Sequence, residues 1–134
     1  MPELDISAEK VAWIILRARE LEGKVAPFMN DREAVDEQGG AILENRPRDA
    51  TEKELRGFFA ALNEDELTNL VALCWIGRGT YEIEDWQEAL SMARAERTNS
   101  TADYLLKTPD LGDLLENGLE AFGIRAAELE ENID

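Results

Sequence analysis

The strongest constraint on the fold is an apolar stretch between two helix-ending signals. Asn63-Glu64-Asp65-Glu66 has the pattern of a capping box, in which the first and last side chains satisfy free amides of the first helical turn. Gly77-Arg78-Gly79 closes the stretch, with Gly77 as the predicted C-cap. One set of apolar residues in this stretch has the spacing of a helix face: Leu67, Leu70, Val71 and Cys74. Further apolar residues occupy the other faces: Leu73, Trp75 and Ile76. A helix that is apolar nearly all round must be central and buried, although a buried strand over 70–76 is the alternative.

Further helical patterns on both sides could cover such a helix. Before it, Val11, Ile14, Ile15 and Ala18 follow a candidate N-cap at Ser7, and Pro27 stops the pattern. Helical spacing returns after it, in segments with these apolar positions: Trp86, Ala89, Leu90, Ala93; Ala102, Leu105, Leu106; and Leu111, Leu114, Leu115, Leu119, Phe122. Within this last part, Thr108-Pro109 predicts a helix start, with proline in the first helical position, and Gly123 a helix end.

Residues 26–50 show no apolar periodicity. They contain Pro27, Gly39-Gly40 and Pro47, which favour a long irregular connection with at most a short helix near 32–37. Thr51-Glu52-Lys53-Glu54 then has the pattern of a capping box for a helix with an apolar face of Leu55, Phe58, Phe59 and Leu62. We therefore expect one all-α domain over 1–134, a bundle of about six helices, with an acidic tail at 124–134 that forms at most a frayed turn or two.

The amino-acid composition excludes several kinds of catalytic and metal-binding site. The 134 residues include 30 acidic and 14 basic ones, a net charge of −16, with no histidine and one cysteine. The lack of histidine excludes triads and metal motifs that need it, and one cysteine excludes an intrachain disulfide. We expect no cofactor. So acidic a chain should bind neither nucleic acid nor anionic membranes. The start MPELDISAEK lacks the pattern of a signal peptide and no apolar run could span a membrane, so we expect a cytoplasmic protein.

Three strings resemble those of an uncharacterised bacterial family, domain of unknown function 3775. They are Glu54-Leu55-Arg56-Gly57-Phe58-Phe59-Ala60-Ala61-Leu62-Asn63, Leu70-Val71-Ala72-Leu73-Cys74-Trp75-Ile76-Gly77-Arg78-Gly79, and Thr101-Ala102-Asp103-Tyr104-Leu105-Leu106 continuing into Thr108-Pro109 and Leu111-Gly112-Asp113. The opening Ile6-Ser7-Ala8-Glu9-Lys10-Val11 is also similar, whereas Lys107 and Asp110 depart from the pattern. The resemblance implies a helical fold over 52–122 and a bacterial cytoplasmic setting. It implies no activity, cofactor or site residue.

Few residues are candidates for chemistry. Asp113, Glu116 and Glu120 share one helix face, which we interpret as a solvated surface and not as a metal site. The loop from Asp31 to Glu44 fails the calcium-loop pattern because its twelfth residue is Ile42. Cys74 lies on the core face with no histidine to activate it. We therefore predict no catalytic residue and no metal ligand.

The best candidate binding residues are Arg78, Tyr81 and Trp86, close together at the corner after the central helix. Arginine and aromatic residues are favoured at interaction hot spots. The alternative is that Trp86 and Tyr81 belong to the core and Arg78 only supports a helix end. Trp13, opposite the apolar face of its helix, should pack on the long connection or contact another subunit.

These features favour a non-enzymatic protein that binds another protein or itself. Two alternatives remain open. One is a small enzyme or metal-binding protein that uses carboxylates alone. The other is an acidic regulator that mimics DNA.

Overall fold

The computed structural model describes residues 3–23, 40–96 and 100–130, and for residues 40–49 it describes the backbone only. Within these ranges the chain forms helices and no strand, which confirms the predicted all-α class. The elements are α1 (Ala8–Leu21), α3 (Gly40–Ala61), α4 (Glu64–Arg78), η2 (Ile83–Asp85), α5 (Trp86–Ala95), α6 (Thr101–Lys107), α7 (Leu111–Ala121) and α8 (Ala126–Glu130).

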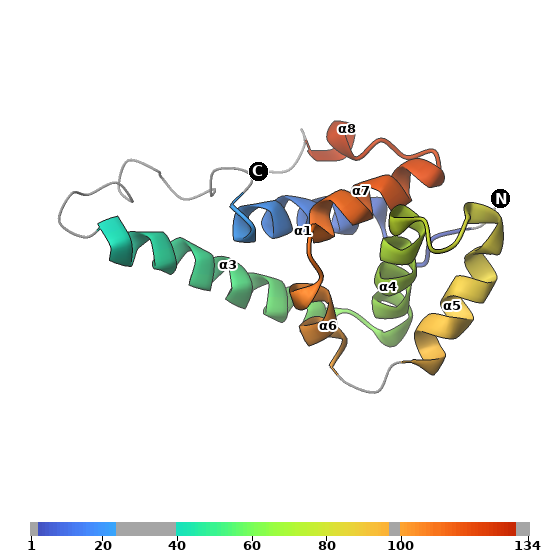
Figure 1. Ribbon diagram of the computed structural model, residues 1–134, viewed down its shortest axis with the longest axis horizontal. Coiled ribbons are helices and arrows are strands. Elements are labelled where there is room, and N and C mark those ends of the chain that lie inside the picture. Colours follow the sequence, from blue (N-terminus) through green and yellow to red (C-terminus); the bar gives the residue numbers. More distant parts are fainter. Residues whose placement is uncertain (1–2, 24–39, 97–99, 131–134) are drawn as a thin grey trace.

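The helix α4 is the centre of the bundle, as its sequence predicts. Every residue from Thr68 to Ile76 is buried, and Asn63 and Glu66 form the reciprocal capping box. Around it lie α7, with which it makes the most extensive helix contact, and α5 and α6 (Figure 1). The helices α1 and α7 run side by side, and α8 lies against α1.

The predicted core faces of the other helices are also confirmed. Ser7 caps α1 by accepting a hydrogen bond from the amide of Lys10, and Gly123 follows α7 in the left-handed conformation. Buried side chains include these from the predicted faces: Val11, Ile14, Ile15, Ala18, Leu55, Phe59, Leu62, Trp86, Ala89, Leu90, Ala93, Leu105, Leu111, Leu115 and Leu119.

The second helix begins earlier than predicted. Residues 40–50 are helical and continuous with 51–61, so the expected connection over 26–50 is wrong for its second half. Pro47 lies within this helical backbone, although a proline removes one backbone hydrogen bond from a helix. Its first half projects away from the other helices (Figure 1). The remainder of the connection, 26–39, includes the expected short helix near 32–37 and lies outside the described residues.

Because α3 is continuous, Thr51 is not an N-cap. Its side chain is buried, and its hydroxyl donates to Glu20 Oε1 of α1 at 3.4 Å. Beside it, the rings of Trp13 and Phe58 stack with centroids 4.5 Å apart. Trp13 therefore packs on α3 at Phe58, and these contacts join α1 to α3. The predicted contact of Trp13 with the long connection concerns residues that lie mostly outside the described ranges.

Gly77 is not the C-cap of α4. The helix continues to Arg78, and Gly79 takes the left-handed conformation with φ 89°. The amides of Gly79 and Thr80 donate to the carbonyls of Ile76 and Trp75, which is a Schellman motif. Gly77 instead lies against α7, where a Cβ would be 1.9 Å from the carbonyl oxygen of Leu114. The C-cap role that the sequence predicted for Gly77 therefore belongs to Gly79.

The predicted start of α7 is displaced as well. Pro109 precedes the helix, Asp110 occupies the N-cap position with φ 58°, and Leu111 is the first helical residue. Thr108 belongs to the end of α6, and its hydroxyl donates to the carbonyl of Tyr104 at 2.8 Å. The amide of Asp110 donates to Glu22 Oε2 at 2.7 Å, which holds this turn against the end of α1.

Candidate functional site

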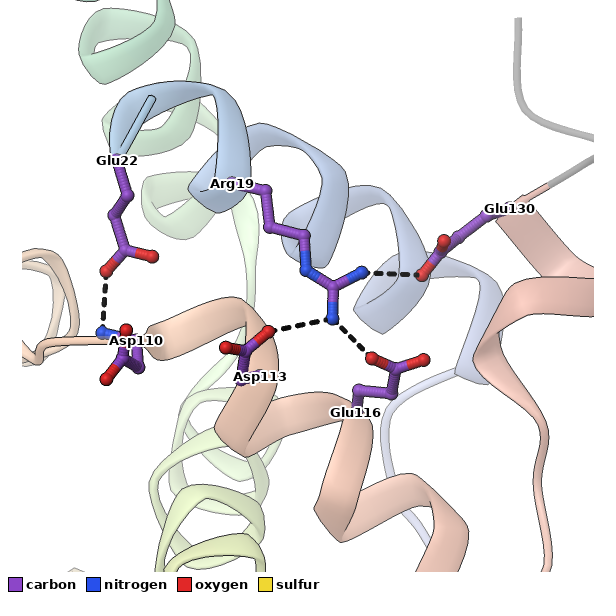
Figure 2. Close-up of polar contacts among 6 residues, drawn as sticks. All are labelled: Arg19, Glu22, Asp110, Asp113, Glu116 and Glu130. Carbon is purple, nitrogen blue, oxygen red and sulfur yellow. Dashed lines mark hydrogen bonds and ion pairs between the residues drawn. The ribbon is translucent and has the colours of Figure 1, made fainter. Parts of the chain in front are cut away.

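Carboxylates from two helices converge on Arg19 of α1 (Figure 2). Its Nη2 atom lies 3.0 Å from Asp113 Oδ1 and also bonds Glu116 Oε1, both of α7. Its Nη1 atom lies 3.8 Å from Glu130 Oε2 of α8. On the predicted solvated face, Glu120 is exposed, whereas Asp113 and Glu116 are partly exposed and also tie α7 to α1.

The cluster favours the charged form of Arg19 but disfavours the charged form of Glu130. Burial on its own would lower the pKa of Arg19, but hydrogen bonds to Glu116 and Asp113 raise it overall, so the guanidinium stays charged. Burial raises the pKa of Glu130, Arg19 opposes the rise, and the negative charge of Glu116 adds to it. One cation faces three carboxylates, and Glu130 has the longest contact. The cluster thus joins α1, α7 and α8, with Glu130 as its weakest member.

We expect Glu130 to make stability depend on pH in a defined direction. Because its folded-state pKa is above the ordinary value, the folded protein binds more protons than the unfolded one just above pH 4.5, and stability falls as pH rises through the folded pKa. Glu130→Gln removes this loss. The melting temperature of Glu130→Gln minus that of wild type should therefore increase as the pH is raised from about 4 to about 7. Glu128→Gln, an exposed change in the same helix, is the control, and equal behaviour of the two variants would contradict the assignment.

The predicted corner divides into a buried and an exposed part. Trp86 is 1% exposed and meets Phe122 edge to face, with ring centroids 4.9 Å apart. It is a core residue and presents no surface to a partner. Arg78 is exposed and Tyr81 is half-buried, so these two remain candidates for binding.

Two further aromatic residues join them. Trp75 lies one helical turn before Arg78 in α4, and its ring is 5.9 Å from that of Tyr81. Its indole Nε1 donates to the hydroxyl of Tyr104 in α6 at 3.1 Å. Tyr104 is 42% exposed, the more exposed of two large hydrophobic side chains that stand out at the surface of the described part, the other being Met92. We call Trp75, Arg78, Tyr81 and Tyr104 the Arg78 face. Sequence reasoning missed Tyr104 because it lies 29 residues from Trp75.

Arg78 differs from the other arginines whose side chains are described. Its Nε atom donates to the hydroxyl of Thr80 at 3.2 Å, and it has no ion pair with any described residue. The remaining described arginines all form ion pairs with carboxylates, namely Arg17, Arg19, Arg56, Arg94 and Arg125. Arg78 thus differs from the other described arginines in having no described carboxylate partner, although the chain holds 30 acids and 14 bases.

Cys74 is buried, as its position predicts. Burial raises the pKa of its thiol to about 12, although the positive charge of Arg78 opposes the rise. The thiol therefore stays protonated near neutral pH and is a poor nucleophile. Across the described ranges, no group of three or more acidic, cysteine or histidine side chains could hold a metal ion, and no helix is long and apolar enough to cross a membrane.

The described chain is thus an all-α domain around one central helix, with two clusters of interest. Its particular family follows from a family profile that matches residues 52–124, described as "Protein of unknown function (DUF3775)". This match covers more than half of the chain, so the chain belongs to that family, as its strings predict. No curated protein and no solved structure matches it. The Arg78 face lies wholly within the matched residues, whereas α1 and α8 lie outside them.

Proposed function

We propose that this protein is a non-enzymatic protein-binding module whose contact surface is the Arg78 face. The observation that carries the proposal is an exposed arginine that forms no ion pair with a described side chain and lies beside partly exposed aromatic side chains. Arginine, tyrosine and tryptophan are enriched among residues that dominate binding energy. The predicted cytoplasmic setting is part of the same proposal.

The chemistry of the face suits a protein ligand. The guanidinium of Arg78 can bind a carboxylate through two parallel hydrogen bonds, because its donors form a planar fork. Tyr104 and Tyr81 offer apolar rings with polar tips, which suit a contact that is partly wet. Trp75 supports both rings from behind, through one hydrogen bond and one ring contact.

We expect Arg78→Ala to weaken association about tenfold or more, with little effect on stability. The stability effect should be small because Arg78 forms no ion pair, and even exposed pairs contribute only about 0–1 kcal/mol. Tyr104→Ala should weaken association similarly. Arg94→Ala is the matched control, since Arg94 is also exposed, in α5, and pairs loosely with Asp65 at 3.5 Å.

The measurement is capture by immobilised protein, comparing wild type, the two face variants and the control, with melting temperatures taken alongside. A protein that wild type and Arg94→Ala retain, and that Arg78→Ala and Tyr104→Ala lose, supports the proposal. Equal retention by all four folded proteins would refute it.

A further inference from the structure

The turn next to Arg78 carries charges of the opposite sign. Glu82, Glu84 and Asp85 are exposed at the start of α5. None of the three forms an ion pair with a described side chain, and Arg78 pairs with none of them although they are four to seven residues away. Exposed charges of both signs that pair with no described side chain therefore lie on the same corner of the molecule, beside Tyr81.

We propose that the Arg78 face binds a second copy of this chain, as a two-fold symmetric dimer in which Arg78 of each copy pairs with a carboxylate of the turn 82–85 of the other. This inference rests on the proposed function and names its partner. In a two-fold interface, residue i meets residue j and j meets i, so a surface must be complementary to itself. A corner that presents an exposed cation and exposed anions, none of which pairs with another described side chain, meets that condition in charge.

Charge complementarity favours a copy over simpler partners. A uniformly acidic partner would suit Arg78 but would be repelled by Glu82, Glu84 and Asp85. A uniformly basic partner would suit the carboxylates but would be repelled by Arg78. A second copy presents both signs in matching positions, with Tyr81 and Tyr104 available to fill the centre. The net charge of −16 opposes association, but charges further apart than about 8 Å are largely screened at 0.15 M salt.

A charge-swap experiment tests the pairing directly. The variants are Arg78→Glu and, separately, Glu82→Arg, Glu84→Arg and Asp85→Arg, all at exposed positions. Melting temperatures are taken alongside, because a reversed charge at the end of α4 or the start of α5 opposes the helix dipole. Arg78→Ala is a milder second variant. Sedimentation equilibrium of wild type from about 5 µM to about 0.5 mM should give a dimer. Arg78→Glu should raise its dissociation constant about tenfold or more.

At least one acid-to-arginine variant should also dissociate, and mixing it with Arg78→Glu should restore a dimer, because the mixed pair has two contacts between a carboxylate and an arginine. The inference is overturned if wild type stays monomeric throughout, if Arg78→Glu dimerises as well as wild type, or if no mixture recovers. If wild type is monomeric while Arg78→Ala loses a captured protein, the inference fails and the proposed function stands.

Discussion

Gly77→Ala should destabilise the fold by about 3 kcal/mol or more, the size expected when a packed core must shift. The new Cβ would lie 1.9 Å from the carbonyl oxygen of Leu114 and 2.8 Å from its carbonyl carbon. Both are backbone atoms of α7, so no side-chain rotation relieves the clash. Gly118 of α7 faces α4 in the same way, since a Cβ there would lie 2.5 Å from the carbonyl oxygen of Leu73. The two helices approach closely because each has a glycine at the contact.

Gly57→Ala is the matched control. Gly57 lies within α3, no atom lies within 4 Å of its would-be Cβ, and the substitution should stabilise by about 0.5–1 kcal/mol through helix propensity. Thermal or urea unfolding of the two variants and wild type measures both effects. A Gly77→Ala variant as stable as wild type would mean that α4 and α7 do not pack as described.

Trp86→Ala should destabilise by about 3–5 kcal/mol, the range for removing a large aromatic side chain from a core. Trp86 is 1% exposed, and the change also removes its edge-to-face contact with Phe122. Trp86→Phe should cost much less. Its indole Nε1 has no hydrogen-bond partner among the described residues, so phenylalanine loses volume but breaks no hydrogen bond.

The same unfolding measurements, with association assays beside them, separate Trp86 from Arg78. We expect Trp86→Phe to keep association at the wild-type level, whereas Arg78→Ala reduces it with stability unchanged. A Trp86→Phe variant that is fully stable and yet fails to associate would return Trp86 to the contact surface and contradict its place in the core.

The features that sequence predicted well depend on neighbours along the chain. The spacing of Leu70, Val71 and Cys74 marks a buried helix because residues three and four apart share a face. The capping box at Asn63 and Glu66 is confirmed because both bonds form within one turn. Trp86 is buried, as its place on an apolar helix face predicts. Its nearness to Arg78 in the sequence, which suggested a binding residue, was the weaker signal.

The features that sequence missed depend on distant contacts. Arg19 meets Asp113 and Glu116 across 94 and 97 residues, and no local pattern marks that pairing. The role of Gly77 follows from where α7 lies, which periodicity does not give. The end of α4 could have been placed correctly from the sequence, because Gly79 is a second glycine that can serve as a C-cap.

The central claim is that the Arg78 face contacts protein, and the three tryptophans provide built-in reporters of it. Each indole N–H gives one signal in a ¹H–¹⁵N spectrum, and only Trp75 lies in the Arg78 face, bonded to Tyr104. Unlabelled chain, or a captured partner, is added to labelled protein up to about 1 mM. We predict that the Trp75 signal shifts or broadens, that those of Trp13 and Trp86 stay fixed, and that Arg78→Glu abolishes the change. A fixed Trp75 signal in a sample where association occurs would contradict the account.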